Sequence, residues 1–470
     1  MNIAAAAQRN EAGIVAVLER LGARFGERLQ TGRALREQHG HTTTYIRNQA
    51  PDGVFYPEAL QEVQEAVRLC AEFGVPVIPF GTGSSLEGHV NAPAGGISFD
   101  MSRMKRVIAV NQEDLDCTVE AGLTREELNQ YLRDTGLFFP IDPGANASLG
   151  GMAATRASGT NAVRYGTMRE NVLSLTAVLA DGRAITTARR ARKSSAGYDL
   201  TRLLVGSEGT LGVITSLTLK LHGIPPAISG GVCPFPTVEA ACNAVIMTIQ
   251  MGIPVARIEL VNTLGMRAIN TYSKLDYPES PCLFLEFHGS EAGVAEQAEM
   301  FGEIAAEFSG GPFVWTAAGE ERQKLWKARH DFYWASFVLR PGSKALSTDV
   351  CVPISRLAEC IMETEADIEE SGLVAPIVGH VGDGNFHVAV MMDTGNPAEI
   401  ARAEAFVSRL NGRALAMEGT CTGEHGIGQG KMRYLEQEHG AGVDVMRTIK
   451  QALDPQGIMN PGKILVPADT

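Results

Sequence analysis

Two histidines in the second half of the chain flank a segment that has the composition of a tight turn. His380 and His387 enclose Val-Gly-Asp-Gly-Asn-Phe, and apolar runs lie on both sides at 373–378 and 388–392. This pattern predicts a strand, a turn and a second strand. Because the turn brings the strand ends together, we expect the two imidazoles to converge although they are seven residues apart in the sequence.

A second glycine-framed segment, Cys421–Gly428, supplies Glu424 and His425. Two histidines and one glutamate, His380, His387 and Glu424, make a three-ligand set that leaves a coordination position of a divalent metal open for water or substrate. The alternative is a pair of turn histidines and an unrelated glycine-rich loop. Four chemically suitable residues on two glycine-framed segments favour the metal site.

The first half of the chain predicts an α/β unit that ends in a ligand-binding loop. A helix over 58–73, with Pro57 at its start, leads through Gly74 into a strand over 75–80. The strand runs into Gly81–Gly88, where glycine allows close backbone approach and successive amides can bind a phosphate. The glycine spacing is not that of a Rossmann turn, and the G-K-[ST] of a P-loop is absent. We therefore expect a pyrophosphate loop of another type.

Two further segments have the same character. Residues 142–167 are a long stretch of small and polar residues without periodicity, and Gly206–Gly212 is a third glycine-rich loop that leads into a strand over 213–219. Long loops of this kind inside a compact domain are usually functional or disordered, and the strands that follow directly argue against disorder. We expect backbone wrapped around a large, flat, hydrogen-bonding ligand.

These loops resemble the FAD-binding domain of flavoenzymes with the vanillyl-alcohol-oxidase-type fold, and among them the D-lactate dehydrogenase (cytochrome) family. D-2-hydroxyglutarate dehydrogenases and the glycolate oxidase FAD subunit are near relatives. The resemblance covers about residues 55 to 465, in matching segments that follow the expected order: 79–88, 142–167, 206–212, 379–387, 423–428 and 453–463.

The resemblance implies a flavin site built from all three loops and the C-terminal segment. Backbone amides and hydroxyls of the first loop would hold the pyrophosphate, and the other residues would line the cofactor. Non-covalent FAD is expected, because Phe80–Ser85 contains no histidine for covalent attachment. The cofactor-binding residues expected are Pro79, Gly81, Thr82, Gly83, Ser84, Ser85, Gly88, Pro143, Ser148, Gly151, Ser158, Asn161, Gly166, Glu208, Gly209, Gly212, Ile214 and Asn460.

Oxidation of a 2-hydroxy acid by a flavin suggests roles for the remaining candidates. A divalent cation would lower the pKa of the substrate hydroxyl and fix its orientation, and a neutral imidazole would accept the proton. We expect His425 to be this base, and Arg329 to bind the substrate carboxylate through its planar guanidinium, with Lys344 and Arg340 as weaker alternates. Asn385 would orient the substrate or a metal ligand. Nitrogen and oxygen ligands suit zinc or manganese, and iron is also compatible.

The expected fold class is α+β, with a two-part FAD-binding domain of the vanillyl-alcohol-oxidase type and an antiparallel α+β cap of ferredoxin-like halves. The cap alternates strands and helices, and we expect its helices on one side of the sheet. The domains predicted are 1–222 for FAD with N-terminal helices, 223–420 for the substrate cap, and 421–470 for a segment that returns to the FAD domain.

Composition limits partners and location. The net charge of −13, without a basic tract, argues against nucleic acid as a partner. Eight scattered cysteines without a CxxC pattern favour reduced thiols, and the N-terminus has no signal-peptide pattern, so we expect a cytoplasmic protein. No apolar run is long enough for a transmembrane segment. The oligomeric state stays open, with a homodimer as one option.

The leading hypothesis is an FAD- and metal-dependent D-2-hydroxy-acid dehydrogenase that oxidises D-lactate to pyruvate. Its electrons would pass to cytochrome c, an electron-transfer flavoprotein or a quinone. The alternatives within the family are D-2-hydroxyglutarate dehydrogenase and the glycolate oxidase FAD subunit. A metal-dependent hydrolase would use the same ligand set but leaves the glycine loops unexplained. A non-catalytic flavin-binding subunit is the third class.

Overall fold

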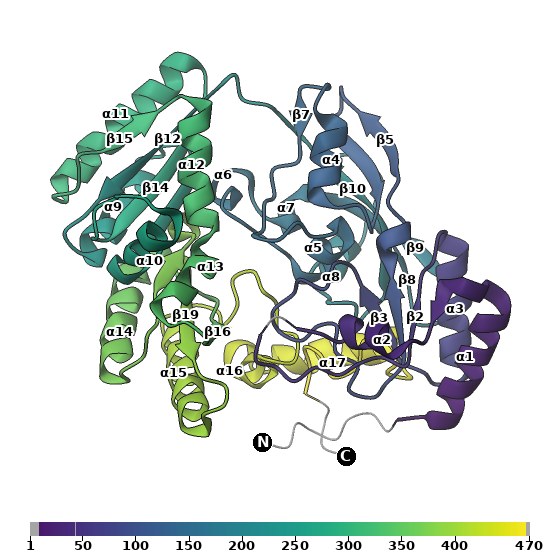
Figure 1. Ribbon diagram of the computed structural model, residues 1–470. Coiled ribbons are helices and arrows are strands. Elements are labelled where there is room, and N and C mark those ends of the chain that lie inside the picture. The colour runs from purple at the N-terminus through teal and green to yellow at the C-terminus, as the bar shows by residue number, and fades with distance from the viewer. Residues whose placement is uncertain (1–8, 43, 467–470) are drawn as a thin grey trace. The chain divides into compact units, whose positions relative to one another are not determined.

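The computed structural model describes residues 9–42 and 44–466, and the chain divides into two compact units (Figure 1). The first unit comprises Met1–Ala157, Thr167–Gly223 and Glu424–Thr470, and the second comprises Ser158–Gly166 and Ile224–Gly423. The chain thus passes from one unit to the other near the predicted boundaries at 222 and 420. Segment Ser158–Gly166 differs from the prediction, because α6 (Ala162–Tyr165) packs beside β13 of the second unit.

Two sheets form the framework of the first unit. A four-stranded sheet has the order β1-β2-β4-β3, and a five-stranded sheet has the order β5-β6-β10-β8-β9. The first packs with α1 and α3, whose apolar stripes are buried, and the second packs with α4 and α5. The strands of these sheets are β1 (Leu29–Gln30), β2 (Gly53–Phe55), β3 (Val77–Phe80), β4 (Ile97–Asp100), β5 (Val107–Asn111), β6 (Asp116–Glu120), β8 (Val172–Val178), β9 (Ala184–Thr186) and β10 (Val213–Lys220).

A short pair, β7 (Leu137–Phe138) and β11 (His222–Gly223), lies outside these two sheets. A capping box begins α4, because the Thr124 side chain accepts from the Glu127 amide and the Glu127 carboxylate accepts from the Thr124 amide. The helices of the first unit are α1 (Glu11–Phe25), α2 (Arg33–His39), α3 (Leu60–Glu72), α4 (Arg125–Leu132), α5 (Leu149–Thr155), α7 (Met168–Asn171), α8 (Leu200–Leu204), α16 (Leu435–His439) and α17 (Gly442–Leu453).

The expectation of a continuous loop over 142–167 is wrong. The segment contains α5 and α6, and α7 follows directly. Its two glycines hide α5 from a propensity argument, but tertiary contacts stabilise the helix: Ser148 caps it, and the amides of Leu149 and Gly150 donate to the carbonyls of Leu123 and Ala121, each at 2.8 Å. Bonds to the segment that follows β6 therefore override the weak local preference for a helix.

The second unit is built on one eight-stranded sheet, in which the order β15-β12-β14-β13-β18-β19-β16 is continuous and β17 also pairs with β19. The strand order β15-β12-β14-β13 is that of a ferredoxin-like half, and the pairings are antiparallel as predicted. The strands are β12 (Ala227–Pro234), β13 (Val255–Val261), β14 (Cys282–Gly289), β15 (Val314–Thr316), β16 (Lys344–Ser347), β17 (Val350–Cys351), β18 (Ile377–Gly379) and β19 (Asn385–Met392).

Helices cover both faces of this sheet, so the prediction of helices on one side is wrong (Figure 1). Alternate residues of β14 enter two different cores: Leu283 and Leu285 pack with α9, α11, α14 and α15, while Phe284 packs with α10, α12 and α13. The strands are accordingly apolar on both faces. These helices are α9 (Val238–Gln250), α10 (Thr263–Ser273), α11 (Glu291–Glu307), α12 (Gly319–His330), α13 (Phe332–Ser336), α14 (Leu357–Glu370) and α15 (Pro397–Ala416).

The end of the chain returns to the first unit beside β3. The Val77 amide donates to the Ile458 carbonyl at 2.8 Å, and the Asn460 amide donates to the Val77 carbonyl at 2.9 Å. Lys463 is buried just beyond, where its Nζ donates to the Asn91 carbonyl at 2.7 Å. Within residues 9–42 and 44–466, no helix has the length and apolar character that crossing a membrane would require.

Lys463 should make the free energy of unfolding depend on pH between neutral and alkaline values. Burial lowers the pKa of Lys463 to about 7, although Glu208 acts in the opposite direction. Between pH 7 and the unfolded pKa of about 10.4 the unfolded chain binds more protons at this site, so its contribution to stability rises with pH. We expect the melting temperature of the wild type, relative to Lys463→Met, to rise from pH 7 to 9. Parallel melting curves at every pH would contradict this.

Candidate active site

The turn between β18 and β19 brings His380 and His387 together. After Gly379 the chain makes one 3-10 turn, Val381–Asp383, and β19 then begins at Asn385. Gly384 has φ 79°, and a Cβ at this position would lie 2.1 Å from the Val352 carbonyl oxygen, so glycine is required there. The two imidazole centroids are 5.3 Å apart at an interplanar angle of 81°. The predicted convergence is therefore present.

His380 is oriented by a buried carboxylate from another strand. Its Nδ1 lies 2.8 and 2.9 Å from the two carboxylate oxygens of Glu259 on β13, and Glu259 also accepts from Nη2 of Arg329. Burial raises the pKa of Glu259, but His380 and Arg329 outweigh it and hold that pKa below its usual value. Glu259 is therefore an ionised, buried group with two partners, as a carboxylate without water requires.

His387 is oriented in the same way from β19. Its Nδ1 donates to the Thr348 carbonyl at 3.0 Å and lies 3.6 Å from Oδ1 of Asp349. In both histidines the acceptor next to Nδ1 favours the tautomer with the hydrogen on Nδ1, which leaves the lone pair on Nε2. Histidines held through one ring nitrogen and ligating through the other are the usual arrangement at protein metal sites.

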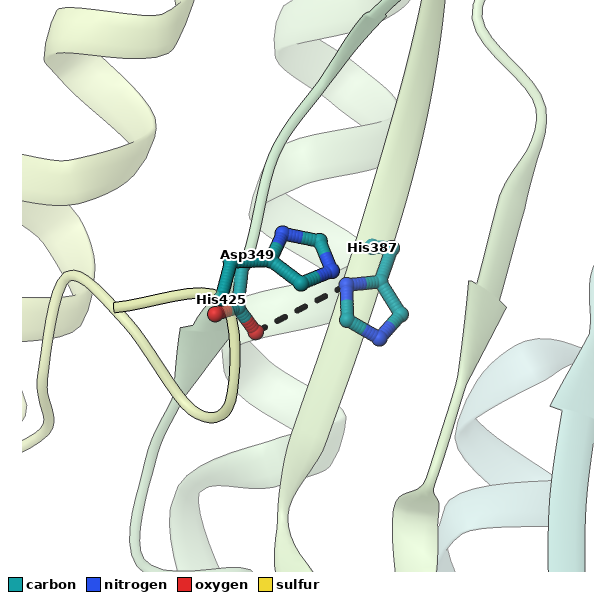
Figure 2. Close-up of side chains that lie close together, drawn as sticks. All are labelled: Asp349, His387 and His425. Carbon is teal, nitrogen blue, oxygen red and sulfur yellow. Dashed lines mark ion pairs between the residues drawn. The ribbon is translucent and has the colours of Figure 1, made fainter. Parts of the chain in front are cut away.

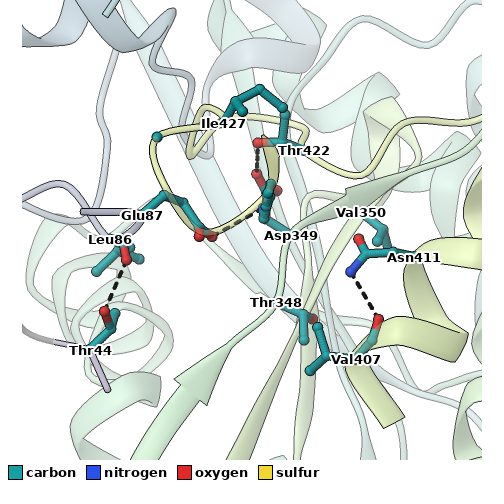
Figure 3. Close-up of polar contacts among 12 residues, drawn as sticks. Thr44, Leu86, Glu87, Thr348, Asp349, Val350, Val407, Asn411, Thr422 and Ile427 are labelled. Carbon is teal, nitrogen blue, oxygen red and sulfur yellow. Dashed lines mark hydrogen bonds and ion pairs between the residues drawn. The ribbon is translucent and has the colours of Figure 1, made fainter. Parts of the chain in front are cut away.

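Asp349 is held by two further side chains. Nδ2 of Asn385 donates to Oδ1 of Asp349 and to the Val350 carbonyl, each at 2.8 Å. The Thr422 hydroxyl donates to Oδ2 of Asp349 at 2.8 Å (Figure 3). The amide nitrogen of Asn385 thus supports Asp349, which leaves Oδ1 of Asn385 for contact with a substrate. The orientation of a substrate by Asn385 stays a prediction.

Glu424 and His425 follow Gly423, the last residue of the second unit, and the chain itself keeps them next to Thr422. Ligand atoms of His380, His387 and Glu424 all lie within 4.8 Å of one another, and the same holds for Asp349, His387 and His425. Figure 2 shows the second group, with the ion pair between Asp349 and His387. The predicted ligand residues therefore come together, and nitrogen and oxygen atoms in this number suit a divalent metal.

Sequence reasoning missed Glu259 and Asp349. Glu259 lies in an otherwise largely apolar strand, and an acidic residue in such a strand is a signal for a buried, paired group. The sequence also did not indicate the partner of Arg329. The guanidinium pairs with Glu259, and its Nε is buried without a hydrogen-bond partner in the described chain. The binding of a substrate carboxylate by Arg329 stays a prediction.

Parts of all three loops converge within the first unit. A Cβ at Gly81 would lie 2.1 Å from the Ser148 hydroxyl, so the first loop rests on the start of α5. The amides of Gly206 and Glu208 donate to the carbonyls of Ala153 and Ala154, each at 2.9 Å, which joins the third loop to the end of α5. Close-packed backbone of this kind suits a pyrophosphate-binding cradle.

Hydroxyl groups accompany this backbone. Those of Thr82 and Ser84 lie 3.1 Å apart, and the hydroxyl of Ser207 is buried without a hydrogen-bond partner in the described part of the chain. The residues present therefore fit FAD. Most of the expected FAD residues belong to the first unit, whereas Ser158, Asn161 and Gly166 belong to the second, where Asn161 accepts from Nε of Arg257 at 2.9 Å.

Glu208 and Asn460 have other partners than those expected. The Glu208 carboxylate accepts from the amides of Ile427 and Gly428 at 2.7 and 2.8 Å. Nδ2 of Asn460 donates to the Glu208 carbonyl at 2.7 Å. Both side chains are bonded within the protein, and their contact with the cofactor stays a prediction.

Comparison with known families agrees with this geometry. Residues 224–464 match the family model described as FAD linked oxidases, C-terminal domain, and residues 51–188 match the model described as FAD binding domain. The chain belongs to the FAD-linked oxidase family. It is accordingly an FAD-dependent oxidoreductase, which confirms the resemblance drawn from the loops.

Curated relatives of this FAD-linked oxidase span most of its length. "Probable D-lactate dehydrogenase, mitochondrial" of Danio rerio is 52% identical over 93% of this chain and 89% of that protein. "D-lactate dehydrogenase [cytochrome], mitochondrial" of Arabidopsis thaliana is 48% identical over 89% of this chain and 74% of that protein. "Glycolate oxidase subunit GlcD" of Bacillus subtilis is 31% identical over 88% of this chain and 89% of that protein.

Solved structures share the fold of the oxidase at low sequence identity. p-Cresol methylhydroxylase with bound substrate has a TM-score of 0.79 at 17% identity, over 99% of this chain and all (100%) of that one. Alkyldihydroxyacetonephosphate synthase has a TM-score of 0.74 at 20% identity, over 98% and 86%. The predicted vanillyl-alcohol-oxidase-type fold is confirmed.

Proposed function

We propose that this FAD-linked oxidase is a metal-dependent D-lactate dehydrogenase. The observation that carries the proposal is the convergence of His380, His387 and Glu424, with ligand atoms within 4.8 Å of one another, in a flavoenzyme. The names of the relatives with about half of their residues identical support D-lactate as the substrate.

The reaction removes a hydride from C2 of the hydroxy acid and a proton from its hydroxyl, which leaves the 2-oxo acid. FAD, when bound, supplies the hydride acceptor, and a divalent cation supplies a Lewis acid that lowers the pKa of the hydroxyl. The Nε2 atoms of His380 and His387 and the carboxylate of Glu424 would hold the cation. Glu259 and the Thr348 carbonyl keep the two imidazoles in the ligating tautomer.

His425 is the proposed proton acceptor. It directly follows the ligand Glu424, and one of its ring nitrogens lies within 4.8 Å of ligand atoms of Asp349 and His387. An imidazole has a pKa near neutrality, which suits a general base at physiological pH. Arg329 is the proposed partner of the substrate carboxylate, through donors that the bond to Glu259 does not use.

A hydrolase could use the same ligand residues, but hydrolysis needs no flavin, and the FAD-binding match and the three loops would then have no role. A non-catalytic flavin subunit would not need a complete set of ligands and base. D-2-hydroxyglutarate and glycolate remain alternative substrates, and the GlcD relative is the reason to test glycolate. Zinc or manganese is proposed as the metal.

Several properties outside the site are also proposals. A cytochrome is the proposed electron acceptor, because the name of the relative from Arabidopsis thaliana contains the word cytochrome. The cytoplasmic location and the homodimer stay predictions.

A substrate screen with a dye acceptor tests the proposal. We expect D-lactate to be oxidised at least ~100-fold faster than L-lactate, equivalent to roughly 2.7 kcal/mol, because a chelated substrate presents its C–H bond to the flavin in one enantiomer only. Removal of metal by a chelator should abolish most of the activity, and re-addition of zinc or manganese should restore it. Glycolate and D-2-hydroxyglutarate are the comparison substrates.

Equal rates for the two lactate enantiomers would refute the D assignment. Full activity after complete removal of metal, measured by elemental analysis of the same sample, would refute the metal role. A higher kcat/KM for glycolate or D-2-hydroxyglutarate than for D-lactate would assign the enzyme to that relative's substrate.

A further inference from the structure

The segment that follows His425 is bound tightly to two glutamates of the first unit. The carboxylate of Glu208 accepts from the amides of Ile427 and Gly428, one oxygen for each amide. The carbonyl of Glu87 accepts from the Gln429 amide at 2.7 Å. Four consecutive residues after Glu424 and His425 therefore include three amides bonded to these two glutamates.

Glycine at every second position makes this contact sterically feasible. A Cβ at Gly426 would lie 2.6 Å from a carboxylate oxygen of Glu208 and 2.8 Å from Nε2 of His89. A Cβ at Gly428 would lie 2.2 Å from the Glu87 carbonyl oxygen. Both glycines also have positive φ, 80° and 48°. The glycines that frame the sequence motif thus serve the approach of this segment to Glu208 and Glu87.

Glu208 is itself held in an unusual conformation. Its φ of 52° lies in the left-handed region, where a glutamate is strained by about 1–3 kcal/mol. Two hydrogen bonds hold the backbone there: the Glu208 amide donates to the Ala154 carbonyl, and Nδ2 of Asn460 donates to the Glu208 carbonyl. Such strain persists only where the surroundings determine it, and it aims the carboxylate at the two amides.

The carboxylate is also ionised. Burial raises the pKa of Glu208, but His89 and the amides of Ile427 and Gly428 outweigh it and hold that pKa below the usual value. The His89 Nε2 lies 3.2 Å from the carboxylate, without hydrogen-bond geometry. Hydrogen bonds to a charged acceptor are about twice as strong as neutral ones, so the two amide bonds to the Glu208 carboxylate tether the segment strongly.

We infer that Glu208 is a positioning residue that holds the Glu424–His425 segment in place for metal binding and proton transfer. The inference rests on the proposed function and adds a residue that touches neither substrate nor metal. Ile427 is three residues from Glu424. Loss of the hydrogen bond from the Ile427 amide to Glu208 would therefore free the backbone that carries Glu424 and His425. A ligand on a mobile loop must be ordered when the metal binds, which weakens binding.

The test uses the full-length protein with Glu208→Gln, and Glu208→Asp as a second variant that keeps the charge but withdraws it by one methylene. Glu120→Gln is the matched control, because Glu120 is also buried in the first unit and accepts from the Arg106 amide at 2.8 Å. Amide hydrogen exchange of the peptide covering 424–431, zinc affinity, flavin absorbance, and kcat and KM for D-lactate are measured for each.

In Glu208→Gln we expect exchange in 424–431 to be at least ~10-fold faster and zinc affinity to fall ~10–100-fold, with flavin absorbance unchanged. At saturating zinc, kcat should fall more than KM rises, because His425 is displaced, and Glu208→Asp should recover part of each effect. Glu120→Gln should leave all four readouts as in the wild type.

Unchanged exchange in 424–431 would overturn the inference, whatever happens to activity. Loss of flavin absorbance with unchanged exchange would show instead that Glu208 is a cofactor residue. The exchange readout does not depend on the metal or substrate, so a wild type without zinc binding would refute the proposed metal role and still leave the tether testable.

Discussion

His387→Ala is expected to remove the bound metal and to lower kcat/KM for D-lactate by ~10³ or more, the loss of a Lewis acid worth several kcal/mol. His387 is one of three proposed ligands, and its Nε2 has no substitute in alanine. The remaining pair, His380 and Glu424, would not complete the coordination of a divalent cation. Metal content by elemental analysis and turnover with a dye acceptor measure the two effects together.

Flavin should stay bound in His387→Ala, because most of the residues expected to hold FAD lie in the first unit and His387 lies on β19 of the second. His439→Ala is the control, since this histidine lies at the end of α16 with 42% of its side chain exposed. It should keep metal, flavin and turnover. Full turnover in a metal-free His387→Ala enzyme would eliminate the metal from the mechanism.

Glu259→Gln is expected to destabilise the second unit by about 3–5 kcal/mol, the usual cost of leaving a buried charge without its partner. Arg329 has 8% of its side chain exposed and Glu259 has 1%, so water cannot replace the lost carboxylate. The melting temperature of the flavin-loaded protein should therefore fall markedly. The melting temperature should be measured in the presence of a chelator, because a bound metal would add its own stabilisation.

The same substitution should weaken zinc binding by ~10–100-fold, because a neutral amide orients the ring of His380 less strongly than the charged carboxylate does. Glu399→Gln is the control, a carboxylate that pairs with Arg340 through two hydrogen bonds at the surface, where little change is expected. The double variant Glu259→Gln with Arg329→Gln should recover part of the lost stability, since no unpaired charge remains. A Glu259→Gln protein with wild-type stability and zinc affinity would show that the pair has no supporting role.

Local signals predicted the elements whose causes are local. The helix α3, which begins shortly after Pro57, and the turn between β18 and β19 both depend on residues within a few positions of one another. Helix α5 was missed for the opposite reason. Its glycines weaken the local preference, and the bonds that stabilise it come from Ala121 and Leu123.

The sequence by itself determined the chemistry of the site: two histidines across a glycine turn, then a glutamate and a histidine in a second glycine-framed segment. The tertiary structure decided which groups orient them. Glu259 is 121 residues from His380, and Glu208 is 219 residues from Ile427. No local pattern encodes such pairs, because they arise when strands and loops from distant parts of the chain pack and their buried charges need partners.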